Sequence, residues 1–480
     1  MILSKQTRIE KIKEIVKRDK ENPFGKLEIP WEDGLRSMEV YKIPLDYLIY
    51  NKYNGRILSR TKSLESQDKK IDVETPEGKG KIEDLLWLSK VDRNEQTLHS
   101  IKTAGGQQKP GIITRDGIII DGNRRAMLLS RSGMYDYFKA VVLPVTLEEN
   151  PLEIEKLETT YQMGEDEKLG YNPIEKYLKA KGLYKTIAKR EYSSTDASPD
   201  QEAVRKISEW MGEDKSTIKD YLQIMETMDD YLDYLEYNGI YTQLDGREDQ
   251  FINLTRWLTT FYGEDSAKAF DGYRDEDVDD LRTIAYDYIR IKYEGKKFRN
   301  LAYGLKENHY FGDREIWSSF RDFHFDQKDK IIEEEINLNS PNLERHLNDR
   351  DKAFLELSKL GKDKSFLHEN DDNHYTWLRN KKAADEPEKL VKNAIRSLES
   401  INQNHKSFSS PSVKTELKSL NEFASKMLKR SSLLKLLAHV ESLLEEIDVS
   451  KSNDDKNKLM EKAKSIQRII YQLTKDIKKS

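Results

Sequence analysis

Residues 107–125 read Gln-Gln-Lys-Pro-Gly-Ile-Ile-Thr-Arg-Asp-Gly-Ile-Ile-Ile-Asp-Gly-Asn-Arg-Arg. Two β-branched runs, 111–114 and 118–120, flank an Arg-Asp-Gly triplet, and Asp-Gly between apolar runs favours a hairpin. A second Asp-Gly pair follows, and then a helical pattern from Ala126 to Gly133. The stretch therefore predicts strand, hairpin, strand, glycine turn and the start of a helix.

Two arginines, Arg124 and Arg125, follow this glycine turn at the N-terminus of the predicted helix. Gly122 has no Cβ, so its backbone can approach a ligand closely. Free N–H groups and the positive end of the helix dipole lie at the same place, where two cations are unfavourable unless an anion compensates them. A bound phosphate would do so. A structural ion pair of Arg124 with Asp121 or Asp116 explains the pattern equally well.

The rest of the chain changes character at about Glu148. Before it, from about residue 38, short β-branched runs alternate with helical patterns such as 81–90 and 95–104; after it, the pattern is helical almost to the end. Residues 300–380 are polar and poorly periodic. The predicted fold class is α+β, a small mixed α/β domain followed by mostly all-α domains. The expected parts are an N-terminal helical arm 1–37, the α/β domain 38–150, a helix-turn-helix domain 151–240, a helical domain of unknown role 241–405 and a C-terminal helical hairpin 406–480.

Composition excludes several classes of protein. The 480 residues include no cysteine, which excludes disulfides, cysteine zinc sites, iron–sulfur clusters and cysteine nucleophiles. No apolar run approaches the ~20 residues that cross a bilayer, and the charged residues 1–19 do not resemble a signal peptide. The net charge is −5, yet residues 381–480 hold 21 Lys+Arg against 14 Asp+Glu. We expect a cytoplasmic protein with no membrane partner, which does not coat nucleic acid nonspecifically but can carry a local basic face.

Residues 202–225 have the layout of a helix-turn-helix. Apolar stripes mark two helices, Gly212 allows the turn between them, and Ser216 is a suitable N-cap for the second. That second helix would lie in the major groove of duplex DNA. The candidate DNA contacts are Lys215, Ser216, Thr217, Lys219 and Gln223. The basic run from Lys176 to Arg190 could supply further phosphate contacts. An ordinary helical hairpin is the alternative, because three acidic residues lie at the turn and on the second helix.

Six motifs occur in order over residues 41–175. They are Tyr41-Lys42-Ile43-Pro44-Leu45, Asn54-Gly55-Arg56, Leu98-His99-Ser100-Ile101-Lys102, Gly106 with Gln108-Lys109-Pro110, Gly122-Asn123-Arg124-Arg125 and Asn172-Pro173-Ile174-Glu175. Together they resemble the N-terminal domain of the ParB/sulfiredoxin superfamily, and the resemblance covers roughly residues 38–240. In that family the Gly-x-Arg-Arg box cradles a nucleoside triphosphate, which is CTP in the chromosome-segregation members, and a helix-turn-helix follows. Sulfiredoxin chemistry needs a cysteine in this turn and is excluded here.

The resemblance implies a nucleotide site at the glycine turn. Its candidate contacts are Asp121, Gly122, Asn123, Arg124 and Arg125, with Gln108 and Thr114 nearby. The sequence departs from the family pattern at Asn123, where the box has glutamate, and in lacking the Glu-Asn-x-x-Arg motif that helps to hold a metal. Glu158 is the nearest acidic candidate for a metal ligand. The implied cofactor is a nucleoside triphosphate, CTP or another, with Mg²⁺.

The sequence thus predicts a ParB-like, nucleotide-responsive DNA-binding protein. Duplex DNA, a second copy of the chain and proteins of a defence or segregation system are the expected partners, and the nucleoid is the expected location. The turn 121–125 also resembles that of NTPase or nuclease components of phage-defence or restriction systems, so an enzyme stays open. A non-enzymatic scaffold with a relic nucleotide box is the third class. No P-loop motif occurs, and the run His368–His374 favours a polar loop over a metal site.

Overall fold

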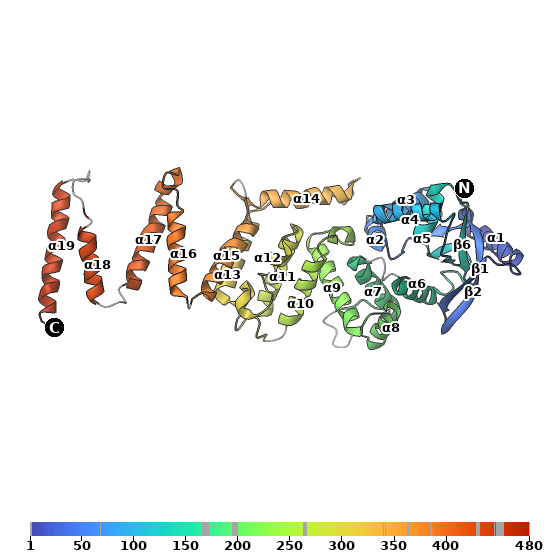
Figure 1. Ribbon diagram of the computed structural model, residues 1–480, viewed down its shortest axis with the longest axis horizontal. Helices are drawn as coiled ribbons and strands as arrows, with labels where there is room; N and C mark the ends of the chain where they lie inside the picture. The colour runs from blue at the N-terminus through green and yellow to red at the C-terminus, as the bar shows by residue number, and fades with distance from the viewer. Residues whose placement is uncertain are drawn as a thin grey trace. The chain divides into compact units, whose positions relative to one another are not determined.

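The computed structural model describes residues 2–67, 69–165, 172–193, 200–262, 266–338, 340, 342–361, 364–384, 386–428, 433–445, 447 and 456–479. The chain divides into two compact units, Met1–Asp385 and Glu386–Ser480 (Figure 1). The first unit holds a mixed six-stranded sheet followed by helices, so the predicted α+β class is confirmed.

The sheet has the strand order β1-β2-β6-β4-β5-β3. The strand bounds are β1 Gly25–Trp31, β2 Gly34–Pro44, β3 Ile49–Tyr50, β4 Gly111–Ile113, β5 Ile118–Asp121 and β6 Tyr137–Val142. The predicted hairpin is the antiparallel pair β4–β5. The sequence analysis missed β1, because Pro30 is typical of a strand break; it is tolerated here because β1 lies at the edge of the sheet.

Both faces of this sheet are covered by helices, because successive strand residues point to opposite faces. On one face, Ile119 packs with side chains of α1 (Lys5–Arg18), α3 (Pro76–Ser89), α4 (Val91–Thr103) and α5 (Asn123–Ser132). On the other face, Ile120 packs with α6 (Pro151–Glu165). A further helix, α2 (Leu58–Glu65), joins β3 to α3.

The helical part of the first unit begins at α7 and has two hydrophobic cores, a small one between α7, α8 and the start of α9, and a large aromatic-rich one that includes most of the remaining helices. Its helices are α7 Pro173–Ala188, α8 Gln201–Met211, α9 Lys215–Tyr234, α10 Glu248–Phe261, α11 Asp275–Arg290, α12 Gly295–Phe298, α13 Arg314–Lys328, α14 Leu343–Leu357 and α15 Phe366–Lys382; the short strands β7 (Lys359–Leu360) and β8 (Lys364–Ser365) form a separate pair.

The poorly periodic stretch 300–380 contains α13, α14 and α15. The polar-loop interpretation of His368–His374 was wrong, since this run lies within α15. His374 is buried there, with hydrogen bonds to the Asn370 carbonyl and to Ser319 Oγ. Polar side chains that are satisfied by tertiary contacts interrupt the apolar stripe, and this hid the helix from the sequence.

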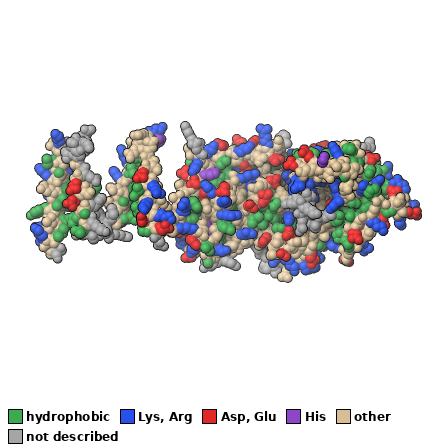
Figure 2. Space-filling view, viewed as in Figure 1, with side chains coloured by type: hydrophobic (Ala, Val, Ile, Leu, Met, Phe, Trp, Pro, Cys, Tyr) green, Lys and Arg blue, Asp and Glu red, His purple; other side chains and the backbone are tan. Residues whose placement is uncertain are grey.

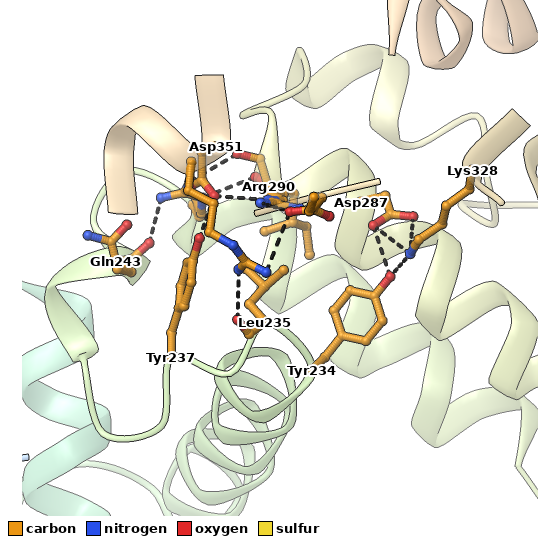
Figure 3. A network of polar contacts seen from close by, with 12 residues as sticks. Tyr234, Leu235, Tyr237, Gln243, Asp287, Arg290, Lys328 and Asp351 are labelled. Atoms are coloured by element: carbon orange, nitrogen blue, oxygen red, sulfur yellow. Dashed lines mark hydrogen bonds and ion pairs between the residues drawn. The ribbon is translucent and has the colours of Figure 1, made fainter. Parts of the chain in front are cut away.

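A buried polar network joins α10, α11 and α14 (Figure 3). Asp351 accepts hydrogen bonds from Arg290 Nε at 2.9 Å, from Arg247 Nη2 at 3.1 Å and from the Tyr237 hydroxyl at 3.0 Å. Arg290 also donates to both carboxylate oxygens of Glu333. Two arginines that are almost fully buried therefore depend on these carboxylates.

The second unit comprises α16 Pro387–Glu399, α17 Pro411–Leu428, α18 Leu433–Glu445 and α19 Lys456–Ile477. None of its described side chains is buried, and large apolar ones lie at its surface, including Val391, 58% exposed, and Ile469, 65% exposed (Figure 2). A second copy of the chain would cover such surfaces, and the predicted homodimer stays a prediction. No described helix has the length and apolar character that a bilayer crossing requires.

Candidate functional site

The glycine turn lies in the wall of a cavity of about 340 Å³. Four of the six motifs meet there, although they are spread over some seventy positions of the sequence between Asn54 and Arg125. The lining residues come from the loop after β3, from α4, from the loop before β4, from the turn between β5 and α5, and from α6: Asn54, Arg56, Thr97, Ser100, Ile101, Gln107, Gln108, Lys109, Asp121, Gly122, Asn123, Arg124, Arg125, Tyr161 and Gln162.

Gly122 is required at its position by both backbone and packing. Its φ is +99°, a left-handed conformation that residues with a Cβ rarely adopt. A Cβ there would lie 2.6 Å from the Phe138 ring. Gly122 is also the N-cap residue of α5, and no side chain caps that helix. The start of α5 therefore keeps the features that favour an anion at a helix N-terminus.

The two arginines of the box have different partners. Arg125 pairs with Asp121 at 2.5 Å and donates to the carbonyls of Lys109 and Pro110. Asp121, one of the two carboxylates considered as a partner of Arg124, thus forms an ion pair with Arg125. Arg124 donates from Nε to Asn94 Oδ1 at 2.5 Å, so a neutral amide orients its guanidinium.

Cationic side chains outnumber carboxylates among the described residues that line the cavity. The cations are those of Arg56, Lys109, Arg124 and Arg125, and the carboxylate is that of Asp121. That carboxylate is already within the ion pair with Arg125. Guanidinium groups hydrogen-bond phosphate oxygens in bidentate fashion. A multiply charged anion such as a phosphate chain is the ligand that this wall favours.

Asn123, Gln108 and Thr114 differ in how they relate to the cavity. The buried Asn123 amide accepts from the Asn51 N–H at 2.9 Å and donates to the Ile119 carbonyl at 3.0 Å, so it holds the loop after β3. Gln108 lines the cavity as an exposed side chain. Thr114 is not among the lining residues: its hydroxyl donates to Asp116 and closes the β4–β5 turn.

Glu158, the metal candidate, lies behind the cavity wall. Its carboxylate accepts from Gln162 Nε2 at 3.4 Å and pairs with Lys179 of α7 at 3.5 Å. Burial raises the pKa of this carboxyl above its ordinary value. Across the described ranges, no three His, Asp or Glu side chains are grouped closely enough to hold a metal ion.

Residues 202–225 do form two helices, α8 and α9. The N-cap prediction for Ser216 was wrong, because α9 begins at Lys215 with Asp214 in the N-cap position. Lys215, Ser216 and Lys219 are exposed, and Thr217 and Gln223 are half-buried. Lys215, Ser216, Lys219 and Gln223 therefore share an accessible face at the start of α9, whereas Thr217 lies on the other side of this helix.

The basic run upstream is largely neutralised. Lys176 pairs with Glu213 at 2.9 Å, and the buried Lys179 pairs with Glu158. Two more lysines of the run are likewise engaged by carboxylates, Lys181 by Asp229 and Lys185 by Glu191. Acidic residues close in space thus remove most of the phosphate contacts expected from this run.

The sequence analysis missed several residues of the cavity wall. Arg56 and Lys109 lie within two of the six motifs, so these motifs could have predicted that both residues line the cavity. Tyr161 and Gln162 of α6 lie in the segment where the family's metal-holding motif is missing. Their side of α6 could be assigned only after the sheet was known.

Comparisons with known proteins were made for the whole chain. No protein-family model matches the sequence, and no curated protein matches it. Among solved structures, the chain is similar to two of a pNOB8-like ParB N-domain. One covers 68% of this chain and 100% of that chain, with 14% identity and a TM-score of 0.32. The other covers 52% and 92%, with 14% identity and a TM-score of 0.31. The motifs that gather at the cavity are four of the six that resemble the ParB/sulfiredoxin superfamily in sequence.

Proposed function

We propose that this chain is a nucleotide-responsive DNA-binding protein whose cavity holds the phosphates of a nucleoside triphosphate. The observation that carries the proposal is the convergence of three arginines, Arg56, Arg124 and Arg125, on a glycine turn at an uncapped helix start. Arginine forks and helix N-termini are both typical phosphate contacts. The resemblance to the ParB/sulfiredoxin box supports the choice of a nucleotide among phosphate-bearing ligands.

A chain of contacts from the cavity to the helical domain supports the nucleotide response. Gln162 of the wall donates to Glu158, and Glu158 pairs with Lys179 of α7. Helix α7 packs against α9, which carries the candidate DNA contacts. A ligand that shifts Gln162 would therefore change the contacts of Glu158 with Lys179. The change would pass through α7 to the candidate DNA contacts on α9.

Replacing Arg124 with alanine should weaken nucleotide binding by at least about tenfold, because the side chain lines the cavity and supplies charge-assisted hydrogen bonds. The measurement is calorimetric titration of the full chain with CTP, ATP, GTP and UTP in the presence of Mg²⁺. Arg131→Ala is the matched control, since Arg131 lies on the same helix but pairs with Asp84 outside the cavity wall. It should bind as the unsubstituted chain does.

The outcomes separate the three classes of function. Binding without steady phosphate release supports the nucleotide-responsive switch. Binding with multiple turnovers of phosphate release would instead make the chain an NTPase. If none of the four nucleotides binds, or if Arg124→Ala and Arg131→Ala bind equally well, the proposed cavity function is wrong, and the scaffold remains.

The accessible start of α9 supports duplex DNA as the partner. Lys and Gln can read base edges in the major groove, and Lys219 and Gln223 lie one turn apart on this helix. Glu213 at the turn does not oppose a DNA backbone as an unpaired charge, because it pairs with Lys176.

The double variant Lys219→Ala, Gln223→Ala should weaken duplex binding by at least about fivefold, since each lost base contact removes roughly 1 kcal/mol or more. The probe is a duplex enriched from a random-sequence library by binding to the full chain. Lys206→Ala is the control, because Lys206 lies on α8 and pairs with Glu202. Unchanged affinity in the double variant would show that α8 and α9 form an ordinary helical hairpin.

A further inference from the structure

Two lysines lie side by side on neighbouring strands of the sheet. Lys42 of β2 and Lys139 of β6 are directly opposite partners in the antiparallel pair. Like charges in this arrangement destabilise a sheet. Within the described part of the chain, neither lysine forms an ion pair with a carboxylate, and Glu39, three positions from Lys42, points to the opposite face of β2. The fold therefore holds two cations together without an anion of its own.

An aromatic ring lies against both of these lysines. The Phe24 ring centroid is 4.1 Å from Lys139 Nζ and 5.0 Å from Lys42 Nζ. The Tyr137 ring lies 4.9 Å from Lys42 Nζ on the other side. Phe24 is 51% exposed, so much of its apolar surface faces water. Cation–π attraction accounts for part of this arrangement, but it leaves the positive charge in place.

A similar contact elsewhere in the chain shows the difference. Lys52 Nζ lies 4.8 Å from the Tyr53 ring, and the same Nζ pairs with Glu65 at 2.7 Å. There the positive charge is balanced by a carboxylate from the protein. At Phe24 the balancing anion would have to come from a ligand.

The lysine pair is joined to the cavity wall. Lys139 Nζ donates to the Gln107 carbonyl at 2.9 Å, and the Lys139 N–H donates to Gln107 Oε1 at 2.7 Å. Gln107 lines the cavity beside Lys109. Through Gln107, the lysine pair on the sheet thus adjoins Lys109 of the cavity wall.

We propose that Phe24, Lys42 and Lys139 form a binding site for single-stranded nucleic acid, in which a base stacks on Phe24 and the lysines hold adjacent phosphates. Exposed aromatic rings among cations are the usual platform for single strands, because every base has a flat face to stack. An acidic peptide would use the lysines but not the ring. A duplex would offer phosphates but no free base.

The test is fluorescence anisotropy of the full chain with labelled 20-nucleotide oligo-dT and oligo-rU. Phe24→Leu keeps an apolar side chain at an exposed site, so folding is preserved, and it should weaken strand binding by at least about fivefold. Lys42→Ala with Lys139→Ala should weaken binding and reduce the slope of log K against log salt by about 1.4, at ~0.7 for each lost phosphate contact. Preference for one of the two oligomers identifies the strand as DNA or RNA.

Two controls make the result decisive. Lys52→Ala should bind the strand within about twofold of the unsubstituted chain, and binding of a 20-base-pair duplex should not change in Phe24→Leu. The proposal is overturned if neither oligomer binds, if Phe24→Leu binds as tightly as the unsubstituted chain, or if the duplex loses as much affinity as the strand. Loss in Arg124→Ala alone would place the strand in the cavity and would equally overturn it.

Discussion

Replacing Asp351 with alanine should lower the free energy of unfolding of this chain by roughly 3–5 kcal/mol. The carboxylate accepts hydrogen bonds from Arg247 and Arg290, whose side chains are 4% and 2% exposed (Figure 3). Without this carboxylate, Arg247 loses its ion pair with Asp351, and Arg290 keeps only the ion pair with Glu333 in this network. An uncompensated buried charge costs far more than the loss of a surface ion pair.

The same helix supplies a matched control for this prediction. Asp349 lies two residues away on α14, is 56% exposed and pairs with Arg345 and Lys352 at the surface. Asp349→Ala should cost less than about 0.5 kcal/mol. Urea unfolding of the full chain, followed by its tryptophan fluorescence, to which the buried Trp317 contributes, measures both variants. Asp351→Asn keeps the shape and some hydrogen bonds, so it should lie between the two. Equal losses for Asp349→Ala and Asp351→Ala would show that the network carries no such energy.

The local elements of the fold could be predicted because their signals are short in sequence. The Asp-Gly turn fixed the β4–β5 hairpin, and Gly212 correctly marked the break between α8 and α9. Gly212 has a φ of +67°, which is why glycine is found there. The edge strand β1 was not predicted, because Pro30 is typical of a strand break. A proline is unfavourable only where both sides of a strand must form hydrogen bonds, and β1 lies at the edge of the sheet.

The contents of the cavity could be predicted only in part. Its motifs were visible, but which arginine pairs with Asp121 depends on the path of α5 away from Gly122. Asp121 ends β5, and across the turn at Gly122 it is Arg125 Nη2 that reaches its carboxylate. The glycine turn drew attention to Arg124 instead, because it lies closer in sequence.

Charges distant in sequence were the hardest to assign. Lys176 and Glu213 are 37 residues apart, yet they pair at 2.9 Å across the turn between α8 and α9. A basic run in a sequence is therefore weak evidence for a basic surface when acidic residues are as frequent as they are here. The site proposed at Phe24, Lys42 and Lys139 was not predicted either, because β1 and its pairing with β2 were not predicted.

The stability of the chain should fall between about pH 4.5 and pH 7 because of Glu175. This carboxylate of the sixth motif is 1% exposed, and burial raises its pKa to about 7. Hydrogen bonds from the Ser59 hydroxyl and N–H, together with the charge of Arg60, oppose that rise without cancelling it, while Asp245 adds to it. The folded chain holds the proton up to about pH 7, whereas the unfolded chain releases it near its ordinary pKa. The stabilisation is therefore complete below about pH 4.5 and is lost as the pH rises through 7, by roughly 3 kcal/mol in all.

Glu175→Gln isolates this effect, because glutamine is neutral at every pH. The difference in unfolding free energy between the unsubstituted chain and this variant should decline by roughly 3 kcal/mol from pH 4.5 to pH 8, whereas the same difference for the exposed Glu202→Gln should stay flat above pH 5. If this difference in unfolding free energy does not change with pH for Glu175→Gln, the carboxylate is ionised in the folded chain at no cost in stability. Ser59 lies in the first turn of α2, which follows β3 of the sheet, and Glu175 lies in the first turn of α7 of the helical part, so the proton lies where the two parts meet. Its release near neutral pH should loosen the contact between them, so the nucleotide response proposed for the cavity should itself depend on pH around 7.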